Sequence, residues 1–267
     1  MNTDETRIIQ RPPRRPLVLV VGCAAIVGLL GLIAHGEDGV SADAVARKYG
    51  FSDNVHVSVS NECLVVESDG IPNHQTAEYP NKDNPNRILK QSYRFVIPLK
   101  PHVSEKPVRT PMGPIGVALN GIPFYNQYTG EGKDAVRTEV FDSCCGHPDM
   151  RGRYHYHKYP VCVKSPFKDP KGEHSPVIGY AFDGFPICGP NGDDGKPPTN
   201  LDECNGHTDE ERGYHYHVTA GYPYVIGAYH GEPEKSNLDH GGGRGGHPPG
   251  GRRRPPPPPG APPPPDE

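Results

Sequence analysis

The chain has 267 residues and a formal net charge of −4, and 33 glycines and 34 prolines interrupt nearly all of its apolar runs. This mild acidity argues against a nucleic-acid partner, because proteins bind nucleic acids through basic surfaces. Between two ends of unusual composition, residues 36–230 are long enough to form one sizeable core or two small ones.

An uncharged apolar run occupies residues 17–34 and follows four arginines. A helix of this length spans about 27 Å, close to the thickness of the hydrocarbon layer of a membrane. The positive-inside rule then places residues 1–16 in the cytoplasm and residues 36–230 outside it. We therefore expect the membrane as a partner, through an uncleaved anchor. Cleavage near residues 34–36, which gives a secreted protein, and a lipoprotein at Cys23 are the alternatives.

The C-terminal residues 231–267 are rich in glycine and proline and carry few apolar side chains. A segment of this composition cannot bury a core, so we expect a disordered tail. The proline run at residues 255–259 predicts at most weak binding to an aromatic groove of a partner protein.

The central region predicts mostly β structure. One helix is expected over residues 41–49, with Ser41 as its N-cap and Gly50 as its stop signal. After it, short apolar or β-branched runs predict strands at residues 55–59, 63–67, 92–97, 115–119, 177–182 and 222–226. The expected fold class is all-β, sandwich-like or barrel-like, with long ordered loops and minor helix.

The tetrapeptide Tyr-His-Tyr-His occurs twice, and each copy follows a Cys-x-Gly-His motif. Residues 144–157 align with residues 204–217 without gaps, and eight of the 14 positions are identical. An Asn-Gly or Asp-Gly turn after an apolar strand lies upstream of each copy. We interpret this order as an internal duplication, with a first unit at about residues 115–157 and a second unit at about residues 177–217.

The two histidines of each tetrapeptide alternate with tyrosines. In a strand, His155 and His157 share one face, whereas the tyrosines occupy the other. A third histidine from the Cys-x-Gly-His motif would complete a site for zinc or copper. The candidate metal ligands are His147, His155, His157, His207, His215 and His217. His74 is a weaker seventh candidate, and whether each unit binds its own ion stays open.

Three other interpretations of the histidines compete with metal binding. They could be structural, with hydrogen-bonded imidazoles above a tyrosine core. They could work in acid–base catalysis with nearby carboxylates, namely Asp142, Asp149, Asp183 and Asp209. The chain could also be a non-enzymatic binding module at the cell surface. Known phosphate-binding, zinc-protease and serine-hydrolase motifs are absent from the sequence. Whether the protein is an enzyme is therefore left open.

Six cysteines follow the apolar run, at positions 63, 144, 145, 162, 188 and 204. An even number in an exported domain predicts three disulfides. Cys144 or Cys145 paired with Cys162 would connect the ends of the first His strand. Cys188 paired with Cys204 would close the loop of the second unit, leaving Cys63 for the remaining bond. The rival interpretation makes Cys144 and Cys204 metal ligands.

Together these motifs resemble the YHYH domain family, over roughly residues 60–230. The resemblance rests on the Asp-x-Cys-x-Gly-His segments, both tetrapeptides and the Asp-Gly-Phe-Pro turn. It implies an exported domain and no particular activity. The chain departs from the family pattern at Cys188, where the family often has tyrosine, and at Ala228, where it often has cysteine. The resemblance therefore implies that Cys204, deprived of its usual partner, bonds to Cys188.

Overall fold

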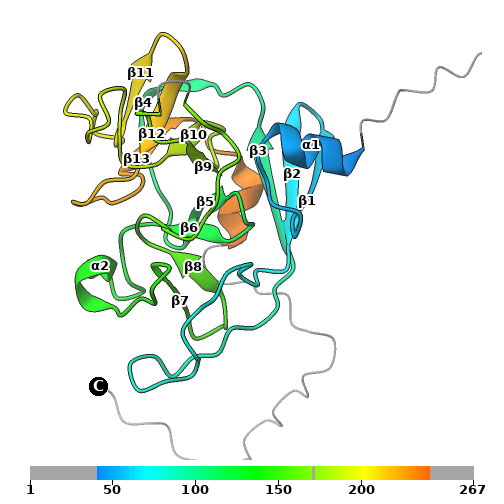
Figure 1. Cartoon of the computed structure of the whole chain (residues 1–267), viewed down its shortest axis with the longest axis vertical. Coiled ribbons are helices and arrows are strands. Elements are labelled where there is room, and N and C mark those ends of the chain that lie inside the picture. The colour runs from blue at the N-terminus through cyan, green and yellow to red at the C-terminus, as the bar shows by residue number, and fades with distance from the viewer. Residues whose placement is uncertain (1–40, 170–171, 241–267) are drawn as a thin grey trace, which may run out of the picture. The chain divides into compact units, whose positions relative to one another are not determined.

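The computed structural model of the chain describes residues 41–169 and 172–240, and these residues form mainly β strands (Figure 1). Within these residues, no helix is long and apolar enough to span a membrane. The expected cytoplasmic segment 1–16 and the expected anchor 17–34 lie outside the described residues. The prediction of an all-β fold is confirmed, although the strands form several sheets and close no barrel in the described part.

The N-terminal part of the described chain is a three-stranded antiparallel sheet with one helix beside it. The helix α1 (Ala42–Lys48) begins at Ser41, whose hydroxyl accepts from the amide of Ala44, as expected of an N-cap. The strands are β1 (His56–Ser60), β2 (Cys63–Ser68) and β3 (Tyr93–Pro98), in the order β1-β2-β3. Their inward residues, such as Val57, Leu64 and Phe95, are fully buried in the main core.

An eight-stranded sheet carries both units. Its strands are β5 (Pro114–Ala118), β6 (Pro123–Tyr125), β7 (Gly146–Pro148), β8 (Tyr154–Tyr156), β9 (Val177–Ala181), β10 (Pro186–Cys188), β11 (Gly206–Asp209) and β12 (Gly213–His217). Their spatial order is β11-β12-β10-β9-β5-β6-β8-β7. In Figure 1 the sheet runs from the yellow β11 and β12 through the centre to the green β8 and β7.

The strand order is symmetric about the centre of this sheet. In each unit an antiparallel hairpin is followed by a strand that pairs parallel to its second arm, and a last strand pairs antiparallel to that one. The units meet where β5 pairs antiparallel with β9, and Val117 lies opposite Tyr180 at the midpoint. The two units therefore have the same topology and are related by an approximate twofold rotation.

The Asn-Gly and Asp-Gly motifs form the predicted turns. Gly121 and Gly184 both have positive φ, 80° and 94°, and each amide donates to the alanine carbonyl three residues earlier. The remaining elements are β4 (Val103–Arg109), α2 (Ala135–Thr138), β13 (Ala228–Gly231) and the 3-10 helix η1 (Lys235–His240). Strands β4 and β13 form a separate two-stranded sheet.

Two expectations are corrected. Residues 222–226 form a turn instead of a strand, since Pro223 has no amide hydrogen to donate and Tyr224 has a φ of 68°. Residues 231–240, the first part of the expected disordered tail, are ordered and include η1. The side chain of Asn237 anchors them by accepting from the Val96 amide at 2.8 Å and donating to the Val96 carbonyl at 2.6 Å. The remainder of the expected tail lies outside the described residues.

Candidate metal centres

Each Cys-x-Gly-His motif begins in a turn built on an aspartate. In the first unit, Asp142 Oδ1 accepts from the amides of Cys144 at 2.9 Å and Gly146 at 3.1 Å. Cys145, between them, has a φ of 69°. Asp202 makes the same pair of hydrogen bonds, at 2.9 and 3.1 Å, in the second unit. The turn therefore sets the start of β7 and β11 in the same way in both units.

The glycine of this motif is required by a tyrosine of the tetrapeptide. A Cβ on Gly146 would lie 2.4 Å from the hydroxyl oxygen of Tyr154, and a Cβ on Gly206 would lie 2.4 Å from that of Tyr214. Tyr154 also donates to Asp142 Oδ2 at 2.7 Å. Turn, glycine and tyrosine thus form one interlocked unit, which explains why these residues recur together.

The alternation of the tetrapeptide separates its side chains as predicted. The Tyr154 and Tyr156 rings meet edge to face on one side of β8, with centroids 5.7 Å apart. On the other side, His155 Nε2 lies 3.0 Å from His157 Nε2. The pairing of β7 with β8 sets His147 opposite His155, which brings the third histidine to the same face.

The first cluster consists of His147, His155 and His157, all of them buried. His155 is its centre, because its Nε2 lies 3.2 Å from that of His147 and 3.0 Å from that of His157. The Tyr125 ring stacks on the His155 imidazole, with centroids 3.9 Å apart. Three ring nitrogens from two adjacent strands thus converge on one point.

The hydrogen bonds at the opposite nitrogens fix which atom carries the proton. The Nδ1 atoms of the first cluster lie 2.6–3.1 Å from backbone carbonyl oxygens, those of Val140, Arg153 and Asn126. A carbonyl oxygen only accepts, so each Nδ1 must donate and each neutral ring keeps a lone pair on Nε2. The three Nε2 lone pairs then point at one another, an arrangement that repels itself unless a cation lies between them.

A carboxylate completes the first cluster. Glu139 Oε2 lies 3.3 Å from His147 Nε2 and 3.6 Å from His157 Nε2, and this side chain is 33% exposed. Burial raises the pKa of Glu139 above its ordinary value. Glu139 and the three histidines line a cavity of about 660 Å³. The first cluster is therefore a four-donor group that opens onto a cavity.

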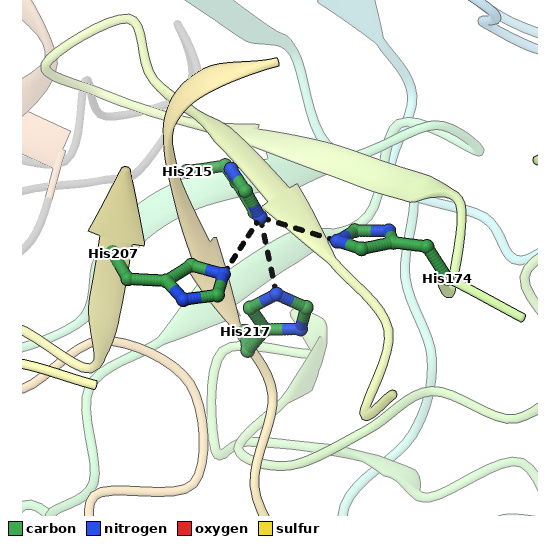
Figure 2. Close-up of side chains that lie close together, drawn as sticks. All are labelled: His174, His207, His215 and His217. Atoms are coloured by element: carbon green, nitrogen blue, oxygen red, sulfur yellow. Dashed lines mark hydrogen bonds between the residues drawn. The ribbon is translucent and has the colours of Figure 1, made fainter. Parts of the chain in front are cut away.

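The second cluster has four histidines, His174, His207, His215 and His217 (Figure 2). His215 is its centre, and its Nε2 lies 3.1 Å from those of His207 and His217 and 3.3 Å from that of His174. Figure 2 shows the other three imidazoles arranged around the tip of His215. Only His207 is partly exposed, and none of the four lines the cavity at the first cluster.

The second cluster repeats the proton arrangement of the first. Its Nδ1 atoms lie 2.7–3.0 Å from oxygen acceptors, namely the carbonyls of Ser175, Gly213 and Gly189 and the side-chain oxygen assigned to Asn200. When the two turns are aligned, Gly189 is the equivalent of Asn126. When the two tetrapeptides are aligned, Gly213 is the equivalent of Arg153. The backbone that orients the histidines is therefore duplicated together with them.

Burial lowers the pKa of the six predicted histidines, His147, His155, His157, His207, His215 and His217, and so favours their neutral form. It lowers the pKa of His157 and of His217 to about 3, and neighbouring histidines add to the effect. It also holds the pKa of His155 well below its ordinary value. Neutral imidazoles are the form that binds metals, so at neutral pH both clusters present free lone pairs.

All six predicted histidines lie in the two clusters, three in each, and the clusters do not share members. His174 and Glu139 were not among the predicted ligands. Their equivalents in the other unit are Pro111 and Thr199, so comparison of the repeats gave no signal for either residue. His74 lies elsewhere, on the tyrosine side, where its Nε2 is 2.7 Å from the hydroxyl of Tyr156.

The cysteines differ from the expected pattern. Cys144 and Cys162 form a disulfide, as one of the predicted pairings had it. The predicted bond between Cys188 and Cys204 is wrong, since both are buried free thiols whose pKa burial raises to about 12. They lie on different sides of the second unit, because Cys188 pairs with His217 in the sheet and Cys204 contacts Tyr214.

Two further cysteine expectations fail for related reasons. Cys63 and Cys145 are free as well, so the described residues contain one disulfide instead of three. Neither cysteine proposed as a metal ligand lies with the histidines, because Cys144 is bonded and Cys204 is grouped with Asp202 and His230. Neither cluster therefore includes a cysteine sulfur among its donors.

The aspartates proposed for acid–base catalysis have other partners. Asp149 forms an ion pair with Arg153 at 2.6 Å, and Asp209 forms one with Arg212 at 2.5 Å. Asp183 accepts from the Tyr216 hydroxyl at 2.5 Å and the Gly231 amide at 3.0 Å. Of these carboxylates, Asp209 comes nearest to a clustered histidine, at 3.9 Å from His215 Nε2. The arrangement does not favour a histidine–aspartate dyad.

Comparison with known proteins identifies one family. A family model described as YHYH protein matches residues 94–199, a shorter span than the expected 60–230. The match includes the first cluster and His174, whereas the second tetrapeptide lies beyond it. Searches of curated proteins and of solved structures found no match to the chain. The comparison thus shows a YHYH protein family match over residues 94–199 of this chain.

Proposed function

We propose that the protein binds transition-metal ions, copper or zinc, with one ion in each histidine cluster. The observation that carries this proposal is the convergence of the Nε2 lone pairs, each on a ring whose Nδ1 faces an oxygen acceptor. Structural histidines would instead use both ring nitrogens in hydrogen bonds to groups of opposite character. Here each Nε2 lies against another Nε2, and in the first cluster Glu139 lies beside two of them.

The spacing of the donors supports an ion of ordinary size. Bonds of about 2.05 Å in tetrahedral geometry separate two donor atoms by about 3.3 Å. The shortest contacts to the central histidine are 3.0 and 3.2 Å in the first cluster and 3.1–3.3 Å in the second. Zinc and copper both accept imidazole ligands, and a carboxylate such as Glu139 suits either of them.

The two clusters suit different roles. Four buried protein ligands are typical of a structural metal site, which describes the second cluster. Three histidines beside a cavity are typical of a site that admits a further ligand, which describes the first cluster when Glu139 moves aside. We infer that the second ion stabilises the fold and that the first ion is accessible from solution.

We also propose that the domain works outside the cytoplasm, anchored to the membrane by residues 17–34 or secreted after cleavage. The Cys144–Cys162 disulfide supports this location, since disulfides persist in oxidising compartments. Fractionation of cells that express the full chain tests it. Recovery with the membrane or in the medium agrees with the proposal, whereas recovery in the cytosol refutes it.

The metal content of the purified full chain tests the main proposal. We expect one ion per cluster by elemental analysis after equilibration with copper or zinc and removal of loosely bound metal. His155→Ala should remove one of the two ions, and His215→Ala should remove the other. Because losing a buried hydrogen bond costs about 1–3 kcal/mol, circular dichroism must first show that both variants are folded.

His230 provides the matched control. It stacks on Tyr214 with ring centroids 3.6 Å apart, on the tyrosine side of the second unit. His230→Ala should therefore leave the metal content unchanged. If the folded His155→Ala and His215→Ala proteins hold as much metal as the unaltered chain, the clusters are structural and the proposal fails.

A further inference from the structure

The cavity at the first cluster is lined by two exposed methionines. The sequence has three methionines, one of which is Met1. The other two are Met112, which is 42% exposed, and Met150, which is 89% exposed. Both line the cavity of about 660 Å³ that contains the first cluster. Methionine usually fills gaps in apolar cores, so packing does not explain why both lie at this place.

Met112 lies in the first unit next to the position that corresponds to His174 in the second unit. Alignment of the Asn-Gly and Asp-Gly turns sets Met112 opposite Ser175, one residue after the position of His174. His174 supplies the fourth nitrogen of the second cluster from the segment that precedes β9. Met112 lies in the equivalent segment before β5, and it lines the cavity that contains the first cluster.

Met112 is also linked to a member of the first cluster through one residue. The Asn126 side chain donates to Met112 Sδ at 3.3 Å, and the Asn126 carbonyl accepts from His157 Nδ1 at 2.6 Å. Met150 lies in the loop between β7 and β8, where its equivalent in the second unit is Glu210. Neither thioether is therefore repeated beside the second cluster.

Thioethers are soft ligands that prefer cuprous ions, whereas zinc is well served by imidazole and carboxylate. We propose that the first cluster is a copper site that captures cuprous ions through Met112 and Met150, and that the second cluster holds zinc. This inference rests on the proposed metal binding and adds the identity of each ion. The histidines of the first cluster supply nitrogen donors to the copper site.

A metal-exchange experiment on the full chain tests the inference. Both clusters are loaded with zinc, and one equivalent of cuprous ion is added as its acetonitrile complex without oxygen. We expect the protein to retain one copper and one zinc against a competing cuprous chelator. The double variant Met112→Leu/Met150→Leu, which keeps size and apolar character, should retain copper at least about tenfold more weakly, with its zinc unchanged.

X-ray absorption at the copper edge gives an independent readout. The native protein should show a sulfur neighbour of copper, and this neighbour should be lost in the double variant. Cys145→Ser serves as a control for thiol binding and should retain the sulfur signal. A double variant that binds copper as tightly as the native chain, with the same sulfur signal, overturns the inference.

The outcomes also distinguish a failure of the copper assignment from a failure of the proposed metal binding. If the chain retains zinc at both clusters and takes up no copper, metal binding stands and the copper assignment is wrong. If copper displaces zinc from the second cluster instead, the assignment of the two ions is likewise wrong. If neither metal binds to either cluster, the proposed function itself fails.

Discussion

The first and second units share one scaffold and differ in what surrounds it. In both, an aspartate turn, a motif glycine and two tyrosines fix three histidines with matching proton arrangements. The differences begin at the fourth donor, which is Glu139 beside a cavity in the first unit and His174 in the second. The duplicated residues thus build the site, and residues outside the duplicated pattern determine its access.

The two units also differ on the face of the sheet that carries the tyrosines. Asn120 and Asp183 are equivalent turn residues, and each contacts the second tyrosine of its tetrapeptide. The Asn120 amide donates to the Tyr156 hydroxyl, so that hydroxyl donates its own proton to His74. Asp183 instead accepts from Tyr216. One substitution therefore reverses the direction of a buried hydrogen bond while the backbone stays the same.

The largest expected effect is on stability when a central ligand is lost. At a metal concentration about 1,000 times Kd, His215→Ala should lower the free energy of unfolding by about 4 kcal/mol. His155→Ala should act in the same direction and less strongly, because its cluster is open to the cavity. Urea titrations with metal and with a chelator measure this difference. If His215→Ala lowers the free energy of unfolding as much with the chelator as with metal, a metal contribution is contradicted.

The next largest difference in stability between the units should come from the Cys144–Cys162 disulfide of the first unit. It closes a separation of 18 residues, so Cys144→Ser/Cys162→Ser should cost about 3 kcal/mol by the loop-entropy relation. Cys204→Ser, at the equivalent of Cys144, breaks no bond and should cost less. Urea denaturation without reductant measures both variants. Peptide mapping that found Cys188 bonded to Cys204 would overturn the assignment of free thiols.

Substituting the motif glycine should lower stability by a similar amount in each unit, because both units share the same scaffold. Gly146→Ala and Gly206→Ala both force a Cβ against a tyrosine hydroxyl, and each should cost about 1–3 kcal/mol. Gly130→Ala is the control, because a Cβ there meets nothing within 4 Å. It should change stability by less than about 0.5 kcal/mol. A large cost in one unit and none in the other would break the equivalence of the units.

The smallest expected effect is the part of the pH dependence that comes from Asp183 in the second unit. Burial raises the pKa of Asp183, so folding favours its protonated form. As the pH rises from below the ordinary aspartate range through the raised pKa, the native chain should lose stability relative to Asp183→Asn. Unfolding of both proteins with chelator present, compared between acid and neutral pH, measures this. A difference that stays constant, or that reverses sign, would contradict the account.

The sequence predicted what depends on local pattern. Alternation placed the histidines and tyrosines of each tetrapeptide on opposite faces, and the Gly121 and Gly184 turns followed from their motifs. The error at residues 222–226 arose because Val225 and Ile226 are buried in a turn and not in a strand. Burial alone makes a short apolar run resemble a strand.

What the sequence could not predict depends on long-range contacts. Glu139 and His174 reach their clusters from segments whose equivalents in the other unit carry no donor. Their roles follow from how the loops cross the sheet, which neither periodicity nor the repeat encodes. The Cys188–Cys204 pairing failed for a similar reason, since proximity in sequence did not show that the two thiols lie on different sides.

Anomalous X-ray diffraction from crystals of the metal-loaded protein tests the central claim most directly. At the copper and zinc edges, we predict one peak in each cluster, about 2.0–2.1 Å from the Nε2 atoms of its histidines. A map with no peak in either cluster, and with the Nε2 atoms turned toward separate hydrogen-bond partners, would contradict the claim that these histidines hold metal.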